Sequence, residues 1–298
     1  MLKEWPLVAF TILGQTAVGI LLAMGLPWIV MGTSASTWTG STTGIFLAFL
    51  GIIFGLLALA AGLSFFHLHH PFRALRVLAN LGTSWLSREI LFELTTMAFV
   101  LLMAGLIWAG IETRWLLKTV MGMACASGLM FLFSMVRLYR LPTLPVWGRL
   151  FTPFSFALTT LSMGTLITAL IWRAFAGPRL FAYELLDYAS LAVLFEIGFV
   201  LIRDPLHGLR IFRPVRSLRP PERVPRGLLI GRLTFLGLGL FLLLVLQKLG
   251  LDAAISDQWL FEPEPGPVLL HLGAVVLVLA AEAAGRFLFY GLVPRPGD

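Results

Sequence analysis

Eight long apolar segments divide this chain, and they constrain its fold more than any other feature. A helix needs about 20 predominantly apolar residues to cross the hydrocarbon core of a bilayer. Only 12% of the residues are charged, about half the share that covers the surface of a soluble domain. The sequence therefore predicts an all-α integral membrane protein with eight transmembrane helices. The predicted spans are Leu7–Met31, Ser41–Phe66, Ile90–Gly110, Trp115–Val136, Phe154–Trp172, Leu185–Ile202, Leu228–Leu246 and Val268–Phe289.

One polytopic domain over residues 1–298 is the simplest architecture for such a chain. A faint internal similarity indicates a subdivision within it. The stretch AFTILGQ in the first segment resembles ALTTLSM in the fifth, and FFHLHHPFRALRV after the second segment can be aligned with VLIRDPLHGLRIF after the sixth. Repeated halves in the same orientation, 1–150 and 151–298, would form two four-helix bundles.

Basic residues are distributed unevenly between the two sides of the membrane. With eight spans, both termini share one side with the connections after the second, fourth and sixth segments, and this side holds 17 of the 22 Lys and Arg residues. Cytoplasmic connections carry the excess of basic residues in membrane proteins, so we expect both termini in the cytoplasm. The densest basic connection, RDPLHGLRIFRPVRSLRPPERVPR, suits anionic lipid or an acidic partner subunit. Its context does not favour nucleic acid.

The connection between the second and third segments, FFHLHHPFRALRVLANLGTSWLSREI, carries an unusual group of ionisable residues. His67 ends one segment and Glu89 begins the next, so both lie at the same membrane face. A histidine–carboxylate pair at the rim of an apolar core suits reversible proton transfer, because histidine titrates near neutral pH. Arg73 would hold a carbonyl or phenolate oxygen. Interfacial side chains that reach toward water are the alternative interpretation, which we favour for His69, His70 and Arg76.

Further ionisable residues lie inside the predicted spans. Glu93 follows Glu89 by one helical turn, and Glu196 lies well inside the sixth segment. Such groups are neutral, paired with another helix or part of a proton path, and we interpret Glu93 and Glu196 as candidates for a path. Glu282 and Arg286 are four residues apart, which is the spacing of an intrahelical ion pair.

Arg137 and Tyr139 end the fourth segment on the same membrane side as His67. They would be interfacial anchors, or they would join the His67 group around a quinone headgroup, which needs donors to two oxygens and an apolar slot for its tail.

The single cysteine, Cys125, excludes a disulfide within the chain, a cysteine-ligated cluster and a zinc site. Histidines suited to a bis-histidine haem are not apparent. We therefore expect no metal and no tightly bound cofactor.

Six motifs recur in the order of a known family. They are EWPLVAFTILGQ at 4–15, HLHHPFRA at 67–74, LSREI at 86–90, MVRLY at 135–139, the Thr152–Pro153 step and AEAAGRFLFYGL at 281–292. Together they resemble the membrane-anchor subunit of dimethyl sulfoxide reductases, a family with eight spans. The resemblance extends over nearly the whole chain.

This resemblance implies a haem-free anchor of a three-part molybdoenzyme in the bacterial inner membrane. Such an anchor exchanges electrons between menaquinone or ubiquinone and a four-cluster iron–sulfur subunit, which is paired with a molybdopterin catalytic subunit. The quinol-site histidine and glutamate of the family correspond to His67 and Glu89, while the anchor itself has no residues catalytic for the terminal substrate. The family usually has His-Leu-Gly-Ser-Pro where this chain has His69 and His70, and an acidic residue is unusual at position 93.

Two branches of the family differ in the side of the membrane that the quinone site faces. In the reductases the site is usually held to face outward, whereas the charge bias here places it inside. An inward site fits a branch that resembles the anchor of cytoplasmic sulfite dehydrogenases, which deliver electrons to quinone. Two other classes stay open: a secondary transporter with Glu196 and Glu282 as coupling groups, and a purely structural anchor.

Overall fold

The computed structural model describes residues 5–31, 40–67, 80–139, 151–176, 180–208, 226–255 and 265–291. These residues form eight long α-helices and no strand, and every helix is long and apolar enough to cross a membrane. The prediction of an all-α membrane protein with eight spans is confirmed. The helices are α1 (Trp5–Met31), α2 (Gly40–His67), α4 (Trp85–Trp108), α5 (Arg114–Tyr139), α6 (Phe151–Ala176), α7 (Leu180–Gly208), α8 (Arg226–Ile255) and α9 (Pro265–Gly291).

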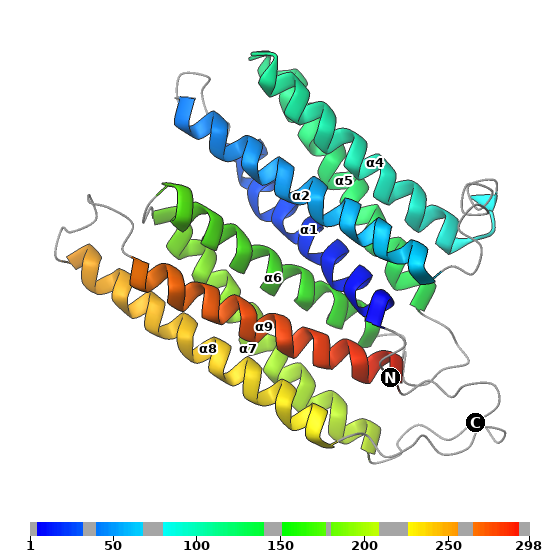
Figure 1. Cartoon of the computed structure of the whole chain (residues 1–298), viewed down its shortest axis with the longest axis vertical. Coiled ribbons are helices and arrows are strands. Elements are labelled where there is room, and N and C mark those ends of the chain that lie inside the picture. Colours follow the sequence, from blue (N-terminus) through cyan, green and yellow to red (C-terminus); the bar gives the residue numbers. More distant parts are fainter. Residues whose placement is uncertain are drawn as a thin grey trace.

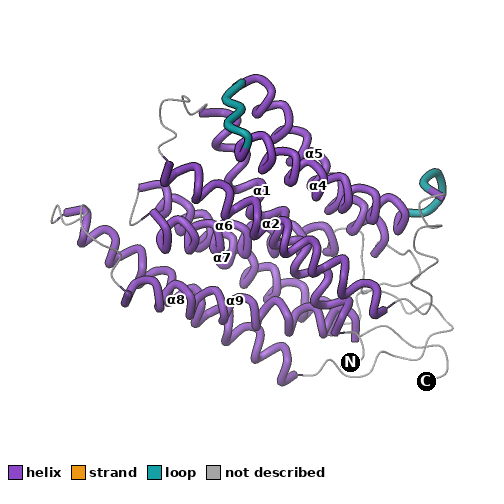
Figure 2. The backbone as a smooth tube through the Cα atoms, turned by 45° about the horizontal axis from the view of Figure 1, so that its top comes forward, coloured by secondary structure: helices purple, strands orange, loops and turns teal. Residues whose placement is uncertain are grey.

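Successive helices run in opposite directions along one common axis (Figure 1). The starts of α1, α4, α6 and α8 and the ends of α2, α5, α7 and α9 lie at one end of the molecule, which we call the N-terminal end. Apart from the short connections at 80–84 and 109–113, the described chain is helical (Figure 2). Residues far apart in sequence, such as those around 10, 90, 139 and 288, are therefore at similar depth.

The helices pack as two rings of four. In the first ring α1 packs on α2 and α5, and α4 packs on the same two helices; in the second, α6 and α8 each pack on α7 and α9. Figure 1 shows the first ring in blue to blue-green and the second in green to red. The same order of packing in both rings agrees with halves at 1–150 and 151–298, although duplication of the sequence stays a prediction.

Helix α1 lies at the centre of the molecule because it packs on helices of both rings. In its spanning window 72% of the residues are buried, compared with 22% in α8. The contact of α1 with α6 is close enough to require glycine on both sides. A Cβ atom on Gly19 would lie 2.8 Å from the Cα of Gly164 and would overlap the carbonyl oxygen of Thr160. This contact joins the two rings.

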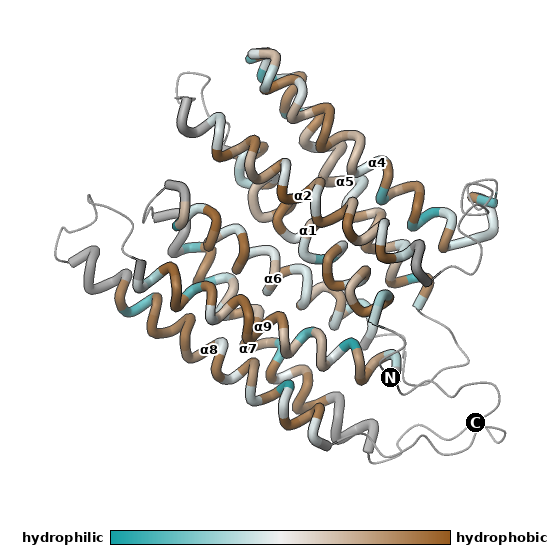
Figure 3. Tube along the Cα trace, viewed as in Figure 1, coloured by the Kyte–Doolittle hydropathy of each residue, from teal (hydrophilic) through white to brown (hydrophobic). Residues whose placement is uncertain are grey.

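The bundle has two apolar cores, one mainly in the first ring and one in the second, and apolar side chains also cover the outside. Phe49, Met103 and Phe131 are buried in the first ring, and Leu186, Leu243 and Val278 are buried in the second. Hydrophobic residues extend along most of every helix (Figure 3). Because lipid tails are as apolar as leucine, outward hydrophobic side chains carry no penalty in a bilayer. Buried polar groups inside such a bundle therefore need a separate explanation.

A candidate functional site at the N-terminal end of the bundle

Helix α4 carries Glu89 into the interior close to the N-terminal end. The helix begins at Trp85 because the hydroxyl of Ser84 accepts a hydrogen bond from the backbone N–H of Ser87 at 3.3 Å, which satisfies one of the free donors of the first turn. Glu89 then falls on the buried stripe of the helix, and only 1% of its surface is exposed. Glu93 is one turn deeper on the same stripe and is 3% exposed.

The two carboxyl groups of this stripe are incompletely paired. Glu89 and Glu93 interact electrostatically with each other. Their Oε1 atoms are buried and receive no hydrogen bond within the described part of the chain. A buried carboxylate without donors is strongly unfavourable, so this pair needs a proton, a bound molecule or a donor from another source. One turn deeper, the Thr96 hydroxyl donates to Ser127 on α5 at 3.0 Å, which ends the polar stripe.

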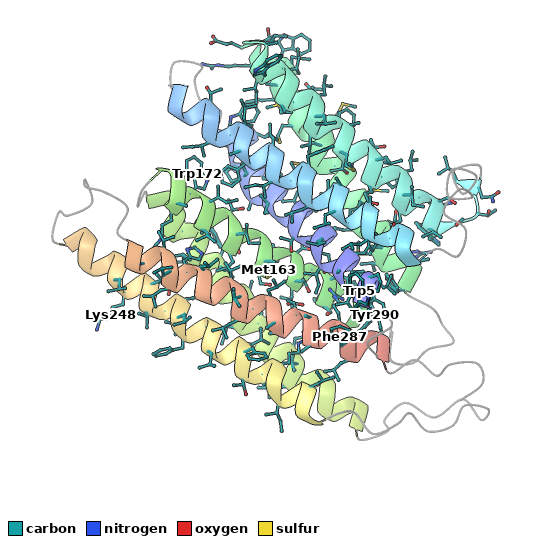
Figure 4. The ribbon with its side chains drawn as sticks, viewed as in Figure 1. Trp5, Met163, Trp172, Lys248, Phe287 and Tyr290 are labelled. Atoms are coloured by element: carbon teal, nitrogen blue, oxygen red, sulfur yellow. The ribbon has the colours of Figure 1, made fainter. Side chains whose placement is uncertain are left out.

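Tyr139 and Tyr290 face Glu89 from two other helices. Tyr139 ends α5 and interacts electrostatically with Glu89. Its ring centroid lies 5.5 Å from that of Tyr290 on α9 and 5.9 Å from that of Phe156 on α6. Figure 4 shows Tyr290 and Trp5 at the N-terminal end of the bundle, with Trp172 and Lys248 at the opposite end. Phenolic hydroxyls, a carboxyl and aromatic rings are thus gathered in one place from α4, α5, α6 and α9.

Arg137 points away from this group. Two residues along a helix correspond to a turn of roughly 200°, so Arg137 and Tyr139 leave α5 on opposite sides. Arg137 is exposed, and its guanidinium lies 4.7 Å above the ring of Trp85. Arg88 occupies the same ring at 4.3 Å and donates to the carbonyl oxygens of Leu81 and Gly82. Arg137 is therefore part of the bundle surface.

Of the histidine group, the structure describes only the backbone of His67. His67 is the last residue of α2, at the same end as the start of α4, and α2 packs on α4. The side chain of His67 lies outside the described residues, as do Arg73, His69, His70 and Arg76. The pairing of His67 with Glu89 stays a prediction, and the backbone agrees with it.

A second buried polar cluster lies between the two rings and inside the second. Glu196 on α7 accepts a hydrogen bond from the Arg232 guanidinium on α8 at 2.6 Å, with both side chains buried. Gly285 on α9 leaves room for this arginine, because a Cβ atom there would lie 2.6 Å from the Arg232 guanidinium carbon. Glu196 is therefore paired with a neighbouring helix.

Glu282 and Arg286 are connected through Thr159 on α6. The Thr159 hydroxyl lies 2.8 Å from Glu282 Oε2, and Arg286 donates to the same hydroxyl at 3.0 Å. Arg286 also donates to the amide oxygen of Gln15 on α1 at 2.6 Å. Among the described residues, Glu282 and Arg286 do not form the predicted direct ion pair: the Thr159 hydroxyl bridges them instead. These contacts tie α9 to α1 and α6.

The sequence did not single out four residues of these clusters: Gln15, Thr159, Arg232 and Tyr290. Arg232 could have been predicted, because an arginine at the seventh position of a spanning helix is rare and is normally paired. Gln15 and Thr159 lie within the two stretches AFTILGQ and ALTTLSM, which resemble each other. Single uncharged polar residues in such apolar stretches do not by themselves indicate a site.

The described residues offer no obvious metal site. No three His, Cys, Asp or Glu side chains among them approach closely enough to hold an ion. His271 on α9 is buried, and its Nε2 lies 2.9 Å from the carbonyl oxygen of Leu166. Cys125 is a buried free thiol on α5. The expectation of no metal and no haem stays a prediction for the whole chain.

Comparison with known proteins gives one family along the full length. A family model described as DMSO reductase anchor subunit (DmsC) matches residues 1–292. The sequence is 29% identical to the YnfH subunit of anaerobic dimethyl sulfoxide reductase from Escherichia coli K12, with 97% of this protein and 94% of that one covered. It is 28% identical to the C subunits of anaerobic dimethyl sulfoxide reductase from E. coli K12 and from Haemophilus influenzae, over 97% and 98% of its length. No solved structure gives a significant match.

Proposed function

Because this chain belongs to the family of DMSO reductase anchor subunits, we propose that it exchanges electrons and protons between membrane quinone and an iron–sulfur partner subunit. The observation that carries the proposal is Glu89, a buried carboxyl with an oxygen that receives no donor from the described residues, beside Tyr139 at one end of the bundle. A carboxyl that can reach a quinone headgroup and water in turn is what proton exchange requires.

The residues have separate roles in this proposal. Oxidation of a quinol releases two electrons and two protons, and reduction of a quinone takes up the same number. The electrons pass to or from the iron–sulfur subunit, while Glu89 and His67 exchange the protons with the two headgroup oxygens. Tyr139 donates a hydrogen bond to one of these oxygens, and Glu93 holds the proton behind Glu89. The aromatic rings around Tyr139 line the headgroup slot.

The partners follow from the same family membership. We propose a four-cluster iron–sulfur subunit and a molybdopterin catalytic subunit, with the site at the cytoplasmic end of the bundle because the basic residues favour that orientation. An inward site also suits delivery of electrons to quinone, as in the sulfite dehydrogenase branch. The continuity of every described spanning helix weighs against the secondary transporter, because transporter sites are typically built on broken helices.

Substitution of Glu89 in the assembled complex tests the proposal. Glu89→Gln removes the exchangeable proton at nearly constant volume and should lower quinone-coupled turnover by about 10²–10⁴-fold. The catalytic subunit should still react with soluble dyes, which bypass the anchor. His67→Ala should behave in the same way.

Glu112→Gln is the matched control. Glu112 is exposed in the connection at the other end of the bundle, so its substitution should leave quinone turnover unchanged. Full quinone activity in both the Glu89 and His67 variants would refute this site.

A further inference from the structure

The interior of the second ring contains four charged side chains that the quinone proposal does not use. Glu196, Arg232, Glu282 and Arg286 are each at most 2% exposed. They come from three helices, α7, α8 and α9, at the N-terminal half of the bundle. Ionisable groups this deep in a membrane protein mark functional sites by default. The arrangement of their hydrogen bonds indicates which function.

Each carboxyl group has one oxygen satisfied and one oxygen without a donor. Glu196 Oε1 accepts from Arg232 at 2.6 Å, and Glu282 Oε2 lies 2.8 Å from the Thr159 hydroxyl. Glu196 Oε2 and Glu282 Oε1 are buried and receive no hydrogen bond from the described residues. The two carboxyl groups lie close enough to interact electrostatically, and Arg232, which binds Glu196, packs against Gly285 on the same helix as Glu282. A hydrogen between the two unsatisfied oxygens would complete this arrangement.

We propose that Glu196 and Glu282 form a carboxyl pair that binds one exchangeable proton, as a proton site separate from the one at Glu89. Two neighbouring carboxylates repel each other strongly where water is excluded, and a shared proton converts the repulsion into a hydrogen bond. The site does not rest on the proposed quinone function, because it is defined by residues of the second ring alone.

Thr159 provides partners for both protonation states. Its hydroxyl accepts from Arg286 and has one proton to donate, while two acceptors lie within reach: Glu282 Oε2 at 2.8 Å and the carbonyl oxygen of Ser155 at 2.9 Å. When Glu282 is ionised, the hydroxyl donates to the carboxylate. When the pair holds its proton between the other two oxygens, Ser155 remains a second acceptor for the hydroxyl proton. Neither protonation state therefore leaves the Thr159 hydroxyl without an acceptor.

The two arginines keep the net charge of the site small in either state. With both carboxyls ionised, Glu196 and Glu282 balance Arg232 and Arg286, and with one shared proton the net charge is +1. Among the described residues, the other hydrogen-bond partners of this cluster are neutral: Thr159 from α6, which contacts Glu282, and Gln15 from α1, which contacts Arg286. A change of one charge is much less unfavourable here than at an isolated buried carboxyl.

Arg286 connects this site to the N-terminal end. Its guanidinium binds Gln15 and Thr159 and interacts electrostatically with Tyr290. The Tyr290 ring in turn contacts Tyr139. A proton gained or lost by the carboxyl pair therefore changes the field at the tyrosines, and a charge that develops near Tyr139 changes the proton occupancy of the pair.

Infrared spectroscopy of the full-length chain in lipid nanodiscs tests the shared proton. A protonated carboxyl gives a carbonyl band that shifts in D₂O and grows as pH falls. Glu89→Gln with Glu93→Gln removes the other carboxyls that are buried among the described residues. Near neutral pH, where exposed carboxyls are ionised, the remaining band then reports the pair. Added to that background, Glu196→Gln or Glu282→Gln should each abolish the whole band. The new amide then donates to the remaining carboxylate and replaces the missing hydrogen.

Two results would overturn the proposal. Independent carboxyls would each lose only their own part of the band, about half in each variant. A band untouched by either substitution would place the proton elsewhere. Glu112→Gln is the control for an exposed carboxyl and should leave the band unchanged.

Gly285→Ala gives a second test that keeps every carboxyl. The added methyl group displaces the Arg232 guanidinium, whose carbon would lie 2.6 Å from it, and so weakens the partner that favours ionised Glu196. The carbonyl band should then persist to more alkaline pH than in the unaltered chain. A titration identical to that of the unaltered chain would contradict the assigned geometry.

Discussion

The contact between α1 and α6 makes a sharp prediction for Gly19→Ala. The new methyl group would lie 2.8 Å from the Cα of Gly164 and would overlap the Thr160 carbonyl oxygen. Non-bonded carbon atoms prefer about 3.5–4.0 Å. The obstructing atoms belong to the backbone of α6, so no side-chain rotation can relieve the overlap. The two helices must separate by roughly 1 Å.

That separation has a definite energetic consequence. A gap of about 0.5–1 Å forfeits roughly a quarter to a half of each van der Waals contact along the interface, and overpacking in buried sites costs about 1–3 kcal/mol. We expect the upper end, about 3 kcal/mol, because backbone faces backbone. The intrinsic preference of helices for alanine over glycine returns about 1 kcal/mol. The net loss in the free energy of unfolding is about 2 kcal/mol.

Gly122→Ala is the matched control for this measurement. Gly122 lies within α5, and a Cβ atom there would meet nothing within 4 Å. This variant should retain only the gain in helix preference, so the two variants should differ by about 3 kcal/mol, or roughly a hundredfold in the folding equilibrium. Reversible unfolding of the full-length chain in mixed micelles, followed by circular dichroism, measures the difference. Equal stability of the two variants would refute the close approach of α1 and α6.

Three further predictions concern other parts of the molecule. Arg286→Leu should lower the free energy of unfolding by about 3–5 kcal/mol, measured in the same micelles, because it removes a buried positive charge beside Glu282 and the donor to Gln15; a neutral effect would contradict the network. Cys125 is 4% exposed and should resist maleimide labelling until the chain is unfolded, whereas rapid labelling of the folded chain would show that α5 is not buried there. Reporter fusions after Arg216 and at Asp298 should report the cytoplasm and one near Glu264 the outside; the reverse pattern would mean that the basic connections serve a partner subunit.

The sequence predicted the eight helices of the fold, but it did not predict which helices pack against each other. Apolar length alone identified all eight spans. Which helices adjoin depends on side-chain shape, and glycine occurs throughout this chain. Nothing local distinguishes Gly19, which is pressed against α6, from Gly122, which meets no other atom. The central position of α1 therefore emerges only from the structure.

The sequence predicted the residues of the candidate site whose type is rare inside a spanning helix, and it did not predict the common polar residues that contact them. Glu89 and Glu196 are conspicuous because carboxyls seldom lie inside spans. The grouping of Arg137 with Tyr139 used their shared membrane side, but a spacing of two residues directs them to opposite sides of a helix. Arg286 was matched with Glu282 by spacing within α9. Its hydrogen bonds to Gln15 and Thr159 involve helices that the sequence does not bring together.

Photolabelling of the assembled complex tests the central claim most directly. A quinone carrying an azide on its headgroup, irradiated in native membranes, should label the start of α4 between Trp85 and Glu93 and the end of α5 at Tyr139. Excess unlabelled quinone should compete, and Glu89→Gln should reduce the labelling. Labelling concentrated on α7 and α8, or at the connection 109–113 at the opposite end, would contradict a quinone site at Glu89.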